Sequence, residues 1–211
     1  DNLELAVKVL DGRGLTGHYW VFYASLTNVE FDLEVFDTVT GQMAVYRNPA
    51  GELASRGDTQ ALPDEGAVAG LGAPTAGVPP IPLAPTSGVE VDVAPIEKTG
   101  PCQPSATALC LGDGRFRLTA RWRDFEGRTG DGMAEALTAD TGTFWFFDAQ
   151  NLELLVKILD GRGFNGHFWV FYASLTNVEM TLTVEDLETG LRRTYRNPIG
   201  TFASRADTEA F

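Results

Sequence analysis

The chain contains one segment twice, and this duplication constrains the fold more than any other feature of the sequence. Residues 1–62 align with residues 150–211 at a constant offset of 149 without a gap, and 40 of the 62 pairs are identical. Residues 20–30 return unchanged as residues 169–179. The two copies therefore share one local fold, and differences between them should reflect differences in their surroundings.

The hydrophobic pattern of each copy has a period of two. In the first copy Leu3, Leu5, Val7 and Val9 alternate with polar or small residues, as in a half-buried strand. Residues 18–26 are apolar or aromatic on both faces, which predicts a central strand that is covered on both sides. Because no stretch has a sustained period of 3.6, we expect an all-β fold of antiparallel, immunoglobulin-like β-sandwich modules.

The distribution of proline divides the chain into three parts. Nine of the eleven prolines lie between residues 63 and 104. A segment of this composition has no apolar stripe and few backbone donors, so we expect residues 63–101 to form a semi-extended linker. Residues 102–211 carry enough short strands for a complete sandwich, whereas residues 1–62 match only the second half of that module.

The incomplete first copy is the main clue to function. We expect residues 102–149 to form the first half of the second module, and the first copy has no equivalent half in the sequence. With neither an initiator Met nor a signal peptide, the chain is expected to be a processed product or a fragment. A sandwich without these strands leaves an open edge and an uncovered core. We therefore expect strands from elsewhere to complete residues 1–62.

Four substitutions between the copies predict where this half is covered. Each replaces a polar residue of the second copy with an apolar one. The first copy has Phe36, Met43, Ala44 and Val45 where the second has Glu185, Arg192, Arg193 and Thr194. Burying a side chain the size of Phe or Met contributes roughly 1.5–3 kcal/mol, which exposure would forgo. We expect this surface to be covered in the assembled protein.

Residues 89–96 alternate cleanly inside the linker and predict a lone strand without a nearby partner. Its apolar residues are Val89, Val91, Val93 and Ile96. One expectation is that this strand inserts into the half module of a neighbouring subunit, as in donor-strand complementation. The alternative is a domain swap in which residues 102–148 of a neighbour dock there. Either contact joins subunits head to tail.

Cysteine and charge content indicate the compartment. Cys102 and Cys110 lie close together, which suits a short disulfide loop in an oxidising environment; two free core thiols are the alternative. The net charge of −13 disfavours nucleic acid or an anionic membrane as a partner. No apolar run approaches the ~20 residues of a membrane span. We expect an extracellular or cell-surface protein.

Candidate catalytic and metal-binding residues are few. His18 and His167 are equivalent residues at strand starts, and an ordinary structural role is favoured for both. Six aspartates in turn-rich segments are expected to stabilise those turns, and calcium binding is the alternative role for them. They are Asp11, Asp37, Asp140, Asp148, Asp160 and Asp186. Because no nucleophile, phosphate-loop or zinc motif is present, we expect neither an enzyme nor a cofactor.

A strand with arginine on one face follows the disulfide segment. Its basic residues are Arg115, Arg117, Arg121 and Arg123. A solvated row is the ordinary interpretation. Acidic residues lie at alternate positions at 179–185 and again at 30–34, so cross-strand pairing between different modules is the other.

The second module carries a recognisable set of motifs. They are Cys102-x7-Cys110-Leu111, Phe144-Trp145-Phe146-Phe147, Val156-Lys157-x-Leu159-Asp160-Gly161, Phe168-Trp169-Val170-Phe171 and Tyr195-x-Asn197-Pro198. Together they resemble an uncharacterised β-sandwich module of secreted bacterial proteins, over residues 102–211 in full and over 2–62 in its second half. The resemblance implies a secreted β domain and supplies no catalytic residues.

The asymmetry between the copies predicts a structural protein. We expect a subunit of an extracellular fibre or pilus-like filament, with other copies of itself as partners. The alternative is a tandem binding or adhesion module of a larger secreted protein, whose aromatic clusters stack on surface glycans.

Overall fold

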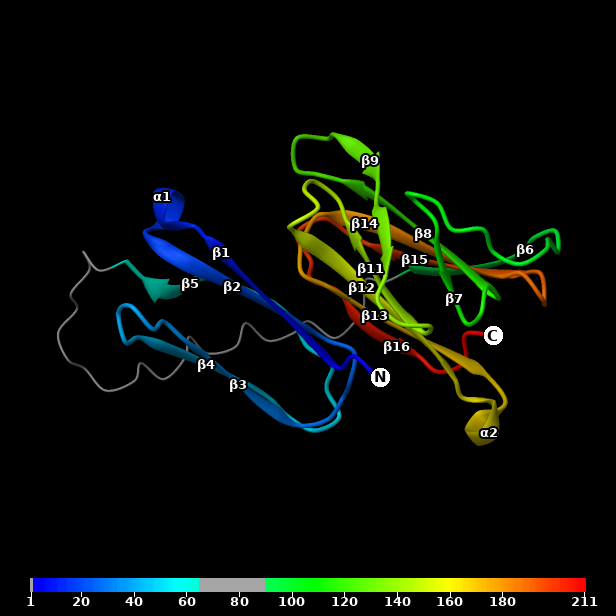
Figure 1. The fold of residues 1–211 in the computed structure, drawn as a ribbon, viewed down its shortest axis with the longest axis horizontal. Helices are drawn as coiled ribbons and strands as arrows, with labels where there is room; N and C mark the ends of the chain where they lie inside the picture. Colours follow the sequence, from blue (N-terminus) through cyan, green and yellow to red (C-terminus); the bar gives the residue numbers. More distant parts are fainter. Residues whose placement is uncertain (1, 65–89) are drawn as a thin grey trace.

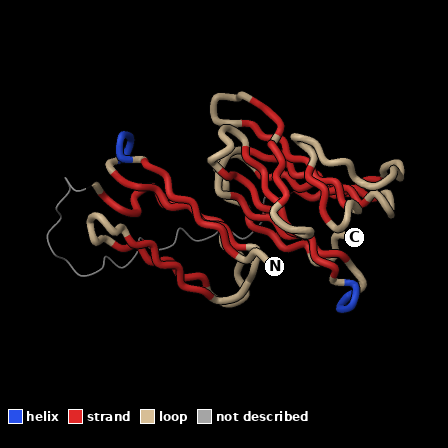
Figure 2. Tube along the Cα trace, viewed as in Figure 1, coloured by secondary structure: helices blue, strands red, loops and turns tan. Residues whose placement is uncertain are grey.

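The computed structural model describes residues 2–64 and 90–211, and nearly all of its regular structure is β-strand. The described residues include two helices, each a single turn. All strand pairs among them are antiparallel. The strands gather into two bodies that lie side by side (Figures 1 and 2). The expected all-β, antiparallel architecture is confirmed.

The first repeat forms a small unit of two layers. One layer is a three-stranded sheet in the order β1–β2–β5, made of β1 (Leu5–Asp11), β2 (His18–Ser25) and β5 (Ser55–Pro63). The other is a hairpin of β3 (Phe31–Phe36) and β4 (Met43–Asn48). The helical turn α1 (Arg13–Thr16) joins β1 to β2. Tyr23 and Tyr46 are buried between the layers, with ring centroids 5.2 Å apart.

The second unit has two larger sheets. The five-stranded sheet has the order β10–β11–β12–β13–β16, with β10 (Met133–Ala136), β11 (Thr141–Trp145), β12 (Leu152–Asp160), β13 (Phe168–Ser174) and β16 (Ser204–Asp207). The helical turn α2 (Arg162–Asn165) joins β12 to β13. The six-stranded sheet follows β6–β15–β14–β8–β7, with β9 also paired to β8. Its strands are β6 (Glu90–Pro95), β7 (Leu109–Leu111), β8 (Phe116–Arg123), β9 (Thr129–Asp131), β14 (Glu179–Asp186) and β15 (Leu191–Asn197).

The core of this second unit lies between its two sheets. Leu154 and Val170 come from the five-stranded sheet, Leu118 and Val184 come from the six-stranded sheet, and all four are fully buried in one cluster. Alternate residues of each strand supply this core, as the period of two predicts.

The repeated segments fold alike. β12, α2, β13, β14, β15 and β16 repeat β1, α1, β2, β3, β4 and β5, with Leu5 opposite Ser25 and Leu154 opposite Ser174. The turn that starts each helix requires glycine because a tryptophan ring packs over it. A Cβ on Gly12 would lie 2.0 Å from Trp20 Nε1, and one on Gly161 would lie 2.1 Å from Trp169 Nε1.

The prediction of a lone strand in the linker is wrong. β6 pairs antiparallel with β15, from Glu90 opposite Arg196 to Pro95 opposite Leu191. It forms the edge of the six-stranded sheet, a place where proline is tolerated because one side of the strand needs no donors. The high proline content of this segment led to the wrong prediction. Because β6 belongs to the six-stranded sheet, the second unit begins before Cys102.

Candidate assembly site

The two repeats contact each other through the outer faces of equivalent sheets. The buried cluster at this contact contains Ala24 and Leu26 of the first repeat with Leu155, Ala173 and Leu175 of the second. Ala24 and Ala173 are equivalent in the two copies, as are Leu26 and Leu175. The turns α1 and α2 lie at opposite ends of the molecule, as an approximate two-fold axis requires (Figure 1). β2 is thus covered on both faces, as predicted, with the hairpin β3–β4 on the other side.

Serine hydroxyls make the same hydrogen bond in both directions across the contact. Ser55 Oγ donates to the carbonyl of Ser174, and Ser204 Oγ donates to the carbonyl of Ser25 at 3.2 Å. The donors are equivalent residues, and so are the acceptors. This reciprocity is typical of an isologous interface, here between two halves of one chain.

Two equivalent lysines also cross the contact. Lys8 Nζ donates to the carbonyl of Leu152 at 2.9 Å, and Lys157 Nζ donates to the carbonyl of Leu3 at 3.2 Å. Burial lowers the pKa of Lys8 to about 8, although the charge of Glu153 opposes this shift. Burial lowers the pKa of Lys157 as well.

Glu153 is a buried acidic group at this contact. Its side chain is buried, and the N–H of Phe146 donates to Oε2 at 2.6 Å, while Oε1 has no hydrogen-bond partner among the described residues. Burial raises the pKa of Glu153 to about 7, against the effects of the Phe146 hydrogen bond and of Lys8. The contact between the repeats therefore contains groups that titrate near neutral pH.

The inner face of the first repeat is only partly covered. Val7 and Val9 are 43% and 48% exposed. Their equivalents Val156 and Ile158 are 0% and 4% exposed because they lie in the two-sheet core of the second unit. The same sequence positions are therefore core in one copy and surface in the other.

The sheet edges of the first repeat are also open. Within residues 2–64 and 90–211, the outer edges of β1, β3 and β4 have no strand partner. The equivalent edges of β12, β14 and β15 pair with β11, β8 and β6. Such edges present unpaired backbone donors and acceptors that favour strand addition.

Three of the four predicted covered residues lie on the outer face of the hairpin. Phe36 and Met43 are directly opposite each other and more than half exposed, and Val45 also faces outward. Ala44 is a correction to this set, because it packs against the inner core of the first repeat. The outer patch of Phe36, Met43 and Val45 has no cover among the described residues of the chain.

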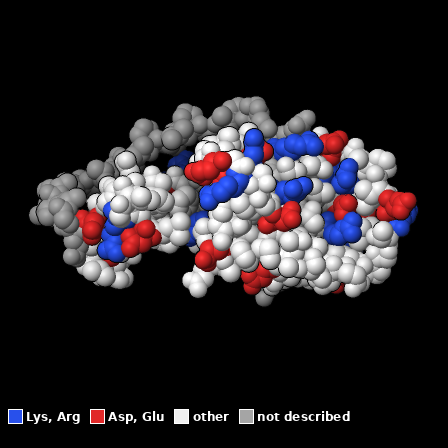
Figure 3. Space-filling model, turned by 90° about the horizontal axis from the view of Figure 1, so that it is seen from above, with Lys and Arg blue, Asp and Glu red and all other residues white. Residues whose placement is uncertain are grey.

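The arginine row of β8 pairs with acids of its own module. Arg115 makes hydrogen bonds of 3.0 and 2.6 Å to Asp186, and Arg117 lies 2.6 Å from Glu185. Arg123 pairs with Glu179 farther along β14. These three arginines therefore form ion pairs within the second unit, and the alternative of pairing with acids of the first repeat is wrong. Positive and negative residues are interspersed over this unit (Figure 3).

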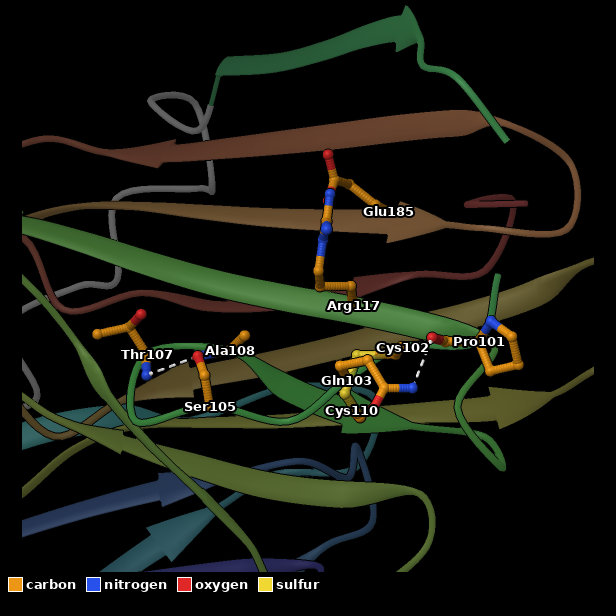
Figure 4. The surroundings of a disulfide bond; sticks show 9 residues. All are labelled: Pro101, Cys102, Gln103, Ser105, Thr107, Ala108, Cys110, Arg117 and Glu185. Atoms are coloured by element: carbon orange, nitrogen blue, oxygen red, sulfur yellow. Dashed lines mark hydrogen bonds and ion pairs between the residues drawn. A yellow bond between two sulfur atoms is a disulfide. The ribbon is translucent and has the colours of Figure 1, made fainter. Parts of the chain in front are cut away.

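The predicted disulfide between Cys102 and Cys110 is confirmed, with Cα atoms 5.7 Å apart (Figure 4). It ties the segment before β7 to β7 itself. The Cys102 N–H also donates to the carbonyl of Gly114 at 2.8 Å. The disulfide and this hydrogen bond thus hold the segment before β7 against the β7–β8 hairpin.

The candidate donor residues are engaged within their own unit. Val91 packs against the core, Val93 is exposed, and the Ile96 N–H donates to the carbonyl of Gly190 at 2.8 Å. Val89 lies outside the described residues. Donation of this strand would require it to leave β15.

The other candidate residues have local roles. Asp11 and Asp160 each bind the arginine two positions later, and Asp37 and Asp186 accept hydrogen bonds from the turn that follows. His18 Nδ1 lies 2.7 Å from the carbonyl of Thr16. In the part of the chain that the structure describes, no three His, Cys, Asp or Glu side chains are grouped as a metal site requires. None of its helices is long and apolar enough to cross a membrane.

Comparison with protein-family models, curated proteins and solved structures gives no significant match. The function is therefore inferred from the burial, strand pairing and side-chain contacts of the chain itself.

Sequence reasoning did not anticipate the contact between the repeats. The signal for it is the apolar character of both faces of residues 18–26, together with a lysine at the same position of each copy. Both faces of this strand were expected to be covered, and both are. The sequence did not identify what covers the outer face, because that partner is the other copy of the same segment.

Proposed function

We propose that the protein is a structural subunit of an extracellular fibre or pilus-like filament, in which strands of another copy complete the first repeat. The exposure of Val7 and Val9, at positions that are core in the second repeat, is the observation that carries this proposal. Burial of each of these side chains would stabilise the protein by roughly 1.5–3 kcal/mol, and exposure to solvent loses this contribution. We further propose that the completed modules are immunoglobulin-like sandwiches.

A swap of residues 102–148 supplies two of the strands that the first repeat lacks, whereas donation of β6 supplies one, the strand beside β4. Residues 102–148 include β8 and β11, the strands whose equivalents are absent beside β3 and β1. For such a swap, β8 and β11 of the second copy must leave their own partners β14 and β12. The contact is heterologous and extends into a filament if it does not close.

The disulfide supports an oxidising, extracellular location for this assembly. Other copies of the chain are the partners that the proposal requires.

Particle size measured against concentration tests the proposal. Light scattering and negative-stain microscopy of the full chain are expected to show species that grow with concentration. The variant Val9→Asp places a charge on the open inner face and is expected to stop this growth, whereas Gln60→Asp at an exposed site of β5 is the matched control. A monodisperse monomer at every concentration contradicts the proposal.

A second candidate function is glycan or surface binding by the second unit. Phe125 and Phe147 are 60% and 45% exposed, and the ring of Phe147 lies 4.8 Å from that of Trp122. Exposed aromatic faces of this kind stack on sugars. A glycan array probed with the chain and with Phe147→Ala tests this function, and signals that are equal for both proteins contradict it.

A further inference from the structure

A small hollow opens on the first repeat between α1 and the turn that joins β3 to β4. Its volume is about 140 Å³. It is lined by Pro63 and Asp64, which follow the repeat, and by Arg13, Tyr19, Asp37, Val39 and Thr40 within it. The equivalent positions of the second repeat hold Arg162, Phe168, Asp186, Glu188 and Thr189.

In the second repeat the same place is filled by the side chain of Arg115. Its Nε and Nη2 donate to the two oxygens of Asp186 at 3.0 and 2.6 Å. Its Nη1 lies 2.8 Å from a carboxylate oxygen of Glu188. Its Cζ lies 4.3 Å from the ring centroid of Phe168. Two acids and an aromatic face thus form an arginine socket.

The carboxylate of the empty socket is already oriented. Asp37 Oδ1 accepts hydrogen bonds from the N–H groups of Val39 and Thr40 at 2.8 and 3.3 Å, as Asp186 Oδ1 does from Glu188 and Thr189. These hydrogen bonds hold the pKa of Asp37 below its ordinary value. In the second repeat the other oxygen of the equivalent carboxylate, Asp186 Oδ2, binds Arg115.

Arg13 lines the socket and does not occupy it. It is the equivalent of Arg162, and each binds the aspartate two positions earlier, at 2.9 and 2.7 Å in both copies. Each also lies over the aromatic ring of its socket, Arg13 at 4.6 Å from Tyr19 and Arg162 at 4.5 Å from Phe168. The second repeat shows that this arrangement holds a further guanidinium beside it.

We propose that the hollow beside Asp37 is a socket for Arg115 of a second copy, whose β8 strand adds to the open edge of β3. The proposal rests on the assembly function above and names the strand that carries it. The β14–β8 register, moved by the repeat offset, places Arg123 opposite Glu30 and Phe116 opposite Asp37. Arginine at both ends of the strand then fixes its direction and register, because a shift by one residue moves both guanidinium groups to the wrong face.

Two substitutions make this site weaker than its intramolecular counterpart. Val39 replaces Glu188, and Phe36 replaces Glu185, the partner of Arg117. The incoming strand therefore loses two ion pairs and gains an apolar neighbour at Phe36. Arg115 of the second copy must leave Asp186 and Glu188 to enter this site, so the exchange is expected to be reversible and to depend on protein concentration.

A fluorescent peptide with the sequence of residues 113–125 tests the socket on the full chain. Fluorescence anisotropy is expected to show saturable binding, and the peptide with Arg115→Gln is expected to bind about tenfold more weakly or worse. In the chain, Asp37→Asn is expected to cause a similar loss. Asparagine keeps the acceptor for the turn but removes the charge, so the turn is retained. Glu52→Gln, at an exposed position outside the socket, is the matched control.

A gain of binding supplies the sharper test. Val39→Glu introduces the carboxylate that Glu188 supplies in the second repeat, at a site that is 81% exposed, so the fold should be unaffected. It is expected to tighten binding of the native peptide by up to about fivefold and to leave the Arg115→Gln peptide unchanged. Equal binding of both peptides, or equal behaviour of Asp37→Asn and Glu52→Gln, overturns the socket.

Failure of the socket and failure of filament formation are distinguishable. A chain that grows with concentration but does not discriminate the peptides retains the assembly function and loses the socket. A chain that stays monomeric but binds the native peptide at Asp37 retains the socket and loses the filament.

Discussion

Lys157 donates a hydrogen bond to the main-chain carbonyl of Leu3, although 154 residues separate the two in sequence. The Lys157 side chain is only 2% exposed, and its other partners are Asn2 and Glu4 of the same first-repeat segment. A buried ammonium group needs such partners, because its loss of hydration is costly. Among the described residues, the hydrogen-bond and ion-pair partners of this buried charge come from the first repeat.

Removal of this lysine tests how strongly the repeats are coupled. Lys157→Ala is expected to lower the free energy of unfolding by about 1–3 kcal/mol, because it leaves a cavity and buried polar groups of the first repeat without their partner. Lys157→Met keeps the aliphatic stem without the charge and is expected to be closer to the native protein. Urea unfolding followed by circular dichroism measures both, and equal stabilities of the Ala and native proteins would refute the coupling.

The contact between the repeats is expected to be least stable between about pH 7 and pH 8. The raised pKa of Glu153, about 7 against an ordinary 4.5, means that its contribution is complete below pH 4.5 and is lost as the pH rises through 7. The lowered pKa of Lys8, about 8 against 10.5, means that stability rises again as the pH rises from 8 to 10.5. Thermal unfolding across this range measures the profile. Glu153→Gln should flatten the acidic limb and move the start of the basic limb to lower pH, because the charge of Glu153 no longer raises the pKa of Lys8; an unchanged acidic limb contradicts the assignment.

A charge at the centre of the contact should separate the repeats. Ala173 is fully buried there, so Ala173→Arg is expected to cost at least about 2 kcal/mol of coupling by burying an unpaired charge. The equivalent variant Ala24→Arg should have the same effect, because the two positions are related by the approximate two-fold axis. Limited proteolysis is expected to cleave the first repeat early in both variants. Gln60→Arg is the exposed control, and resistance of the Ala173→Arg protein equal to this control would contradict the prediction.

Reduction of the disulfide should destabilise the second unit. The loop between Cys102 and Cys110 is short, with a sequence separation of 8, and closing such a loop contributes about 2.5 kcal/mol through the unfolded state. The double variant Cys102→Ser/Cys110→Ser is expected to unfold at lower urea than the native protein by this amount. Reductant should shift the native protein to match the variant and leave the variant unchanged; a native curve insensitive to full reduction would show that the bond adds no stability.

The alternation of apolar and polar residues predicted most of the strands. Proline content gave a wrong prediction where the strand partner is far away in the sequence. Alternation correctly placed Leu5 and Val9 in β1 and residues 18–26 in a strand covered on both faces. Proline content led to the wrong interpretation of β6, since its partner β15 lies about a hundred residues away and an edge strand accommodates proline. The socket beside Asp37 could not be predicted from the sequence pattern. It is recognised only by comparison with Asp186 of the second repeat, which binds Arg115.

The reciprocal contact between the repeats has a consequence for how the sequence can change. Across an approximate two-fold axis, residues near the axis meet their own equivalents, so one substitution alters a surface that the other copy must still fit. Residues 20–30 and 169–179, which contribute Ala24, Leu26, Ala173 and Leu175 to this contact, are identical over their whole length. A change at any of these positions in one copy must therefore be tolerated by the same segment of the other copy.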